Sequence, residues 1–115
     1  MDVVNLEKEL SSSYTILQNS VTLRLPPELS FFSGHFPENP ILPAVAFVDI
    51  SHFLIQKIFP DFKDSAIKKI NVLKIKTSLA PETPCQIFFD KKDSFRFFIT
   101  WSNSSGTIAE LGLDY

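Results

Sequence analysis

The segment FFSGHFPENPILPAVAFVD, residues 31–49, decides how this chain folds. It contains His35, one of only two histidines. Three of the eight prolines also fall in it: Pro37, Pro40 and Pro43. Proline fixes its own φ angle and disfavours a helix at the preceding residue, so we expect residues 31–43 to be irregular and rigid. The segment ends at Asp49, a carboxylate within an apolar run. The pattern therefore predicts a rigid connection between a potential base and a potential acid.

The apolar run that follows Pro43 predicts a helix over about residues 44–59, with Pro60 ending it. Apolar side chains cover nearly every direction of this helix: Val45, Phe47, Val48, Ile50, Phe53, Leu54, Ile55, Ile58 and Phe59. We therefore expect the helix to be buried on almost all sides. Three polar side chains interrupt that surface and fall on one side at ~100° per residue: Asp49, His52 and Gln56.

The rest of the chain alternates apolar and polar residues, which indicates strands. The first extended segment is residues 15–25, and Pro26-Pro27 end it. Further strands are predicted in residues 67–79, 85–90, 95–101 and 108–115, with turns at 81–84, 90–93 and 103–106. A strand, a long helix and an antiparallel meander together predict an α+β fold. In it, one curved antiparallel sheet wraps around one long central helix.

Length and composition limit the classes of function. We expect a single domain over residues 1–115, with residues 1–13 as a short helical or loose leader. The net charge of −2, with no basic block, argues against nucleic-acid binding. The apolar region 41–59 includes Asp49 and Lys57 and is a poor membrane span. The leader lacks the basic segment followed by an apolar segment that a signal peptide has. The single cysteine fits a reducing compartment, so we expect a cytoplasmic protein.

The motif that begins Gly34-His35-Phe36-Pro37, followed by Pro40 and by Ile41-Leu42-Pro43, resembles that of a known family. These are the hotdog-fold 3-hydroxyacyl-acyl carrier protein dehydratases, the FabA/FabZ-like superfamily. Asp49 stands fourteen residues after His35, which is the family's spacing for its acid. The Ile-Leu-Pro sequence, the aspartate and the short length look most like a compact subgroup associated with aryl-polyene synthesis.

The resemblance implies a lyase that converts 3-hydroxyacyl thioesters on acyl carrier protein to trans-2-enoyl thioesters, in fatty-acid or polyene-type synthesis. It implies His35 as the base and Asp49 as the acid, and imidazole and a carboxyl in apolar surroundings suit these roles. The residues that it implies for substrate binding are Gly34, Phe36, Pro43, Ala44 and Val45. It also implies a homodimer with the site between subunits, His35 coming from one chain and Asp49 from the other. We expect no cofactor, and two histidines and one cysteine do not form a metal set.

Two departures from the family motif keep other functions open. The family has glycine where this chain has Glu38 and Ala44. A non-catalytic hotdog subunit that binds acyl carrier protein or a partner dehydratase is therefore an alternative. An acyl thioesterase on the same fold is another. His52 lies one turn after Asp49, and either orients it or belongs only to the polar stripe.

Overall fold

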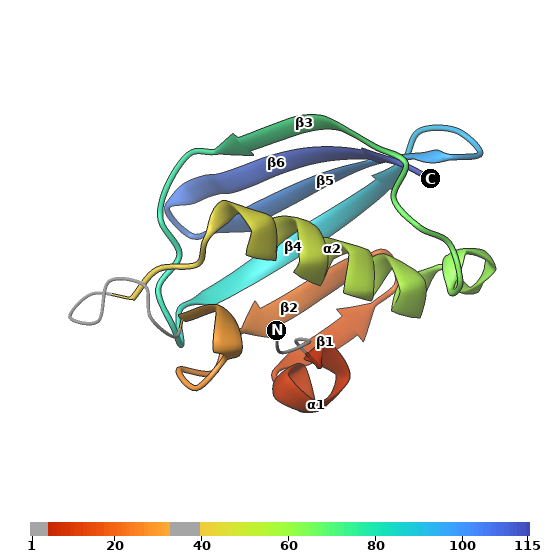
Figure 1. Cartoon of the computed structure of the whole chain (residues 1–115). Helices are drawn as coiled ribbons and strands as arrows, with labels where there is room; N and C mark the ends of the chain where they lie inside the picture. The colour runs from red at the N-terminus through yellow and green to blue at the C-terminus, as the bar shows by residue number, and fades with distance from the viewer. Residues whose placement is uncertain (1–4, 33–39) are drawn as a thin grey trace.

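The computed structural model describes residues 5–32 and 40–115 (Figure 1). Its elements in chain order are α1 (Leu6–Leu10), β1 (Tyr14–Leu17), β2 (Ser20–Arg24), η1 (Ser30–Phe32), α2 (Ala44–Ile58), η2 (Pro60–Phe62), β3 (Lys69–Ile75), β4 (Pro84–Lys91), β5 (Arg96–Asn103) and β6 (Gly106–Asp114). The long helix lies where the sequence predicts it.

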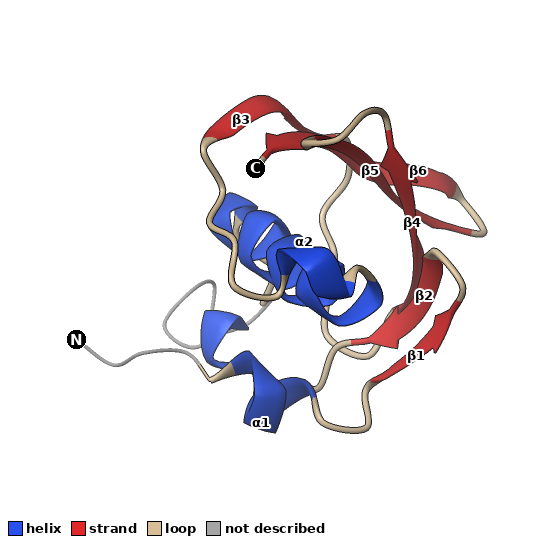
Figure 2. Cartoon of the chain, turned by 90° about the vertical axis from the view of Figure 1, so that its right-hand side faces the viewer, coloured by secondary structure: helices blue, strands red, loops and turns tan. Residues whose placement is uncertain are grey.

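The six strands form one sheet in the order β1-β2-β4-β5-β6-β3, and every neighbouring pair is antiparallel. The chain crosses from α2 to the far edge of the sheet, where β3 pairs with β6, before β4 returns beside β2. The sheet curves around α2, which lies along its concave face (Figure 2). The predicted α+β fold, a curved antiparallel sheet around one long helix, is confirmed.

The inner side of α2 packs on the sheet through fully buried side chains. Phe47 lies edge-on to Trp101 of β5, with ring centroids 4.8 Å apart. The indole Nε1–H of Trp101 donates to Ser51 Oγ at 2.9 Å, and both residues have no exposed surface. Buried polar groups of this kind must be paired, so the hydrogen bond fixes the rotation of α2 relative to the sheet. That rotation decides which side chains of α2 face outward.

We expect Ser51→Ala to lower the free energy of unfolding by about 1–3 kcal/mol, because it leaves the buried Trp101 N–H without its acceptor. Urea denaturation of both proteins measures the difference. The control is Ser104→Ala, the same change at an exposed turn residue, which should stay within about 0.5 kcal/mol of the wild type. Equal midpoints for Ser51→Ala and wild type would show that this hydrogen bond contributes nothing.

The prediction that α2 is buried on almost all sides is wrong. Ala44, Val45, Asp49 and Lys57 are exposed, and 58% of the Val45 surface is accessible. A single curved sheet covers only one side of a helix. The outer side of α2 therefore carries the polar stripe and, near its start, an uncovered valine.

The predicted single strand over residues 15–25 is also wrong. It is a hairpin of β1 and β2, in which Gln18 at the turn has a φ of 57°. The neighbouring Asn19 side chain donates to the Phe89 carbonyl at 3.1 Å, which holds the turn against β4. Gln18, Asn19 and Ser20 are three consecutive polar residues between apolar segments, a turn signal that the prediction of one continuous strand missed.

The end of β3 also differs from the sequence prediction, whereas the leader is helical, one of the two forms predicted for it. Strand β3 ends at Ile75 and not at residue 79, because the amides of Lys76 and Thr77 both turn to the Ile108 carbonyl. The leader contains α1, capped by the Asn5 side chain, which accepts from the Lys8 amide. Leu10 at its end is fully buried, so α1 is attached to the core.

Candidate active site

The residues predicted for the site divide between described and undescribed parts of the chain. His35, Gly34 and Phe36 lie outside the described residues, as does Glu38. The other predicted residues are described, and all of them belong to the first half of α2 or to its cap: Pro43, Ala44, Val45 and Asp49.

The start of α2 is held in place by backbone contacts. The Leu42 amide donates to the Leu79 carbonyl at 2.8 Å, which ties the loop before the helix to the segment after β3. Pro43 is the N-cap, with φ −71° and ψ 158°, and makes no side-chain capping bond. Helix geometry leaves the first amides, those of Ala44 and Val45, without carbonyl partners in the helix. Together with the helix dipole they can bind a carbonyl oxygen that gains negative charge.

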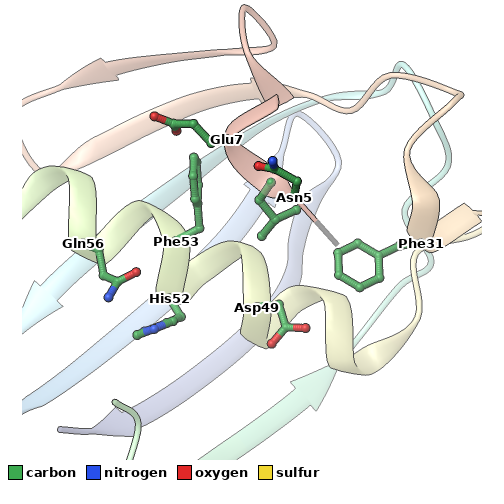
Figure 3. A pocket seen from close by; sticks show the side chains of 8 residues that line it. Asn5, Glu7, Phe31, Asp49, His52, Phe53 and Gln56 are labelled. Carbon is green, nitrogen blue, oxygen red and sulfur yellow. The ribbon is translucent and has the colours of Figure 1, made fainter. Parts of the chain in front are cut away.

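A pocket of about 530 Å³ opens on the outer side of α2. Its lining residues come from α1, η1, α2 and the residue before α1: Asn5, Leu6, Glu7, Phe31, Asp49, His52, Phe53 and Gln56. Figure 3 shows Phe53 directed toward α1, while Asp49 and His52 follow each other along α2. The polar stripe predicted from the sequence therefore forms the α2 wall of the pocket, and the phenylalanines supply apolar surface beside it.

The surroundings of Asp49 shift the pKa of its carboxyl upward. Partial burial against the pocket raises the pKa of Asp49 above its ordinary value, and the nearby His52 opposes this by lowering it. Loss of solvent is the larger cause, since burial disfavours the charged carboxylate. A carboxyl with a raised pKa keeps its proton to higher pH, as a proton donor requires.

His52 has a partner that the sequence does not indicate. Its Nδ1 lies 2.7 Å from the hydroxyl of Tyr115, and the two rings stack with centroids 5.5 Å apart. Tyr115 follows β6 and is only 8% exposed. The two residues are far apart in sequence and come together only because β6 lies beside α2 in the fold. No local pattern could have revealed the pair.

Gln56, the third member of the stripe, has a structural role in the fold. Its Nε2 donates to the Lys63 carbonyl at 2.7 Å, with longer contacts to the carbonyls of Phe62 and Ser65. It therefore anchors the connection between α2 and β3.

Among residues 5–32 and 40–115, no group of three or more His, Cys, Asp or Glu side chains is arranged to hold a metal ion. In the same part of the chain, no helix has the length and apolarity to cross a membrane.

Comparison with solved structures places the fold. A chain of the dehydratase heterocomplex ApeI:P from Xenorhabdus doucetiae superposes with a TM-score of 0.71 and 22% identity, covering 85% of this chain and 88% of that one. An uncharacterized protein from Erwinia carotovora subsp. atroseptica gives a TM-score of 0.68 and 16% identity, with 89% and 88% covered. The predicted hotdog fold is therefore confirmed.

Comparison with sequence families gives the class of protein. No curated protein matches the sequence. The sequence model of the ApeI-like family, described as ApeI dehydratase, matches residues 11–109. This range contains the whole Gly-His-Phe-Pro motif, the pocket side of α2 and five of the six strands in full. The protein therefore belongs to the ApeI-like dehydratase family.

Proposed function

We propose that this dehydratase acts on 3-hydroxyacyl thioesters carried by acyl carrier protein and releases trans-2-enoyl thioesters. Asp49 is the acid and His35 is the base. The observation that carries this proposal is the position of Asp49: its carboxyl lines an accessible pocket and has a raised pKa. Family membership supports dehydration as the type of reaction, and the Gly-His-Phe-Pro motif supports the choice of base.

The chemistry follows from what the reaction requires. His35 removes the proton beside the thioester carbonyl, and the electron pair moves toward the carbonyl oxygen. The amides of Ala44 and Val45 stabilise the resulting negative charge at the start of α2. Asp49 then donates its proton to the 3-hydroxyl group, which leaves as water while the carbon–carbon double bond forms. Protonated Asp49 is the form required, which agrees with its raised pKa.

We further propose that the active assembly is a dimer in which β3 of one copy meets β3 of another. β3 is an edge strand in the described sheet, so one side of its backbone is open to further pairing. Its apolar side chains are poorly covered, with Ile70 47%, Leu73 39% and Ile75 39% exposed. The register places Leu73 opposite the buried Leu111, on the face of the sheet that α2 packs against. A second copy would cover these side chains and the exposed Val45.

A second hotdog subunit is the alternative partner for the same edge. The structural relative is part of a dehydratase heterocomplex, ApeI:P, and this favours a related but different chain as the occupant. In that case the chain described here could be the non-catalytic member. Co-purification with an active dehydratase, together with an inert isolated protein, would support this alternative.

The product of the purified protein decides among these functions. We expect mass spectrometry to detect loss of water from a 3-hydroxyacyl chain on acyl carrier protein, with the product still attached to the carrier. Substrates of several chain lengths, with and without an aryl end, should be compared. Release of free acid would instead identify a thioesterase. If no enoyl product forms at any chain length, the enzymatic proposal is wrong.

A further inference from the structure

The pair formed by His52 and Tyr115 has no role in the dehydration scheme, yet it stands next to the acid. His52 and Asp49 line the same pocket from the same face of α2, three residues apart. The hydroxyl of Tyr115 holds the imidazole through a 2.7 Å contact with Nδ1. The imidazole of His52 can gain and lose a proton, and in this pocket its charge interacts with the charge of Asp49.

The phenol of Tyr115 is rigidly placed. Its ring packs edge-on against Phe62 and Phe97, with centroids 5.5 and 5.6 Å away. Its amide donates to the Phe95 carbonyl at 2.7 Å, which continues the β5–β6 pairing. Because the backbone and the ring are both anchored, Tyr115 fixes the orientation of the His52 imidazole.

The hydrogen bond also selects the tautomer of His52. Burial raises the pKa of Tyr115, so the phenol keeps its proton at neutral pH. Among the described contacts, His52 Nδ1 is the one acceptor that the hydroxyl reaches. We expect the hydroxyl to donate to Nδ1 and the neutral imidazole to carry its hydrogen on Nε2. Burial also lowers the pKa of His52, which favours this neutral form, while Asp49 opposes the shift.

We propose that His52, held by Tyr115, is a positioning residue that sets the protonation state of the acid Asp49. This inference rests on the proposed role of Asp49 in the dehydration. His52 acts through its charge, and Tyr115 holds the ring in a fixed orientation in the pocket that Asp49 also lines. When His52 carries a proton, its positive charge stabilises the carboxylate of Asp49 and lowers the pKa of that carboxyl; when His52 is neutral, this effect is absent.

Other charged groups near the stripe are already paired or directed elsewhere. Glu7 of α1 forms an ion pair with Lys57, with 2.6 Å between Oε1 and Nζ. Asp114, next to Tyr115, accepts from Nε and Nη2 of the Arg96 guanidinium, at 2.7 and 3.0 Å. Tyr14 of β1 forms an edge-to-face pair with Phe53 of α2, with ring centroids 5.9 Å apart. Among the described residues, His52 is therefore the titratable group coupled to Asp49.

NMR titration tests the coupling without any need for turnover. The chain has two histidines, so the imidazole signals of His52 are assigned by their loss in His52→Asn. The carboxyl signal of Asp49 is assigned in the same way with Asp49→Asn. We expect wild-type His52 to show the Nε2–H tautomer and Tyr115→Phe to show a mixture. We expect the pKa of Asp49 to rise in His52→Asn, because the opposing charge is gone, and the pKa of His52 to fall in Asp49→Asn.

The second tyrosine provides a matched control. Tyr14→Phe removes a hydroxyl from a ring that packs against Phe53 of α2 and has no contact with His52 among the described ones, and it should leave both titrations unchanged. In the pH profile of kcat, the alkaline limb should move to higher pH in His52→Asn, since Asp49 then keeps its proton longer. A merely structural role for His52 would lower activity evenly across pH.

The outcomes separate this inference from the proposed function. If Asp49 titrates identically in wild type and in His52→Asn, the inference is overturned even in an active enzyme. If the titrations shift as expected but no substrate is dehydrated, the coupling stands and the proposed function fails.

Discussion

Asp49→Asn should reduce kcat for dehydration by about 10²–10⁴-fold, because the amide has the size of the carboxyl but no proton to donate to the leaving hydroxyl. The residue is exposed on the outer side of α2, and its carboxyl makes no hydrogen bond or ion pair with the described residues that the amide would break. The fold should therefore be retained, and thermal unfolding of the variant should match the wild type. Substrate binding, measured as KM, should change much less than kcat.

The control for Asp49→Asn is the same substitution at Asp61, an exposed residue of η2. It removes one negative charge from a position away from the pocket and should leave kcat unchanged. If the Asp49→Asn enzyme kept its activity, Asp49 would not be the acid of the reaction. Its position in the pocket would then be the only part of the interpretation to remain. Equal losses in both variants would point to net charge as the cause.

Mixed dimers should show that His35 and Asp49 act from different chains. A dimer of one His35→Ala chain and one Asp49→Asn chain, isolated with two affinity tags, contains one complete site if sites lie between subunits. We expect it to regain about half of the wild-type activity, although each variant alone is inactive. The exposed edge and apolar side chains of β3 support such a dimer.

The reciprocal dimer makes the experiment decisive. When a wild-type chain pairs with a chain that carries both substitutions, every site shared between subunits lacks one of the two residues. This dimer should be inactive. Sites contained within single chains would give the reverse, with about half activity here and none in the first dimer. Isolation of monomers alone, with full activity, would contradict the dimer itself.

Much of the fold could be predicted because its signals are local. Pro43 and Pro60 delimit α2, and the alternation around Ile87 and Ile99 indicates the central strands. The prediction failed where the deciding contact comes from a distant segment. The turn at Gln18-Asn19 is held against Phe89 of β4, and β3 ends where the Lys76 amide reaches the Ile108 carbonyl.

The candidate site divides in the same way. Residue identity and the helical period are enough to predict the motif, the spacing of Asp49 from His35 and the polar stripe of Asp49, His52 and Gln56. The open pocket in front of this stripe arises on folding, since one sheet covers one side of α2 and the buried bond from Trp101 to Ser51 fixes the rotation of the helix. Packing likewise raises the pKa of Asp49 and brings Tyr115 to His52, because burial and contacts between distant segments exist only in the folded chain.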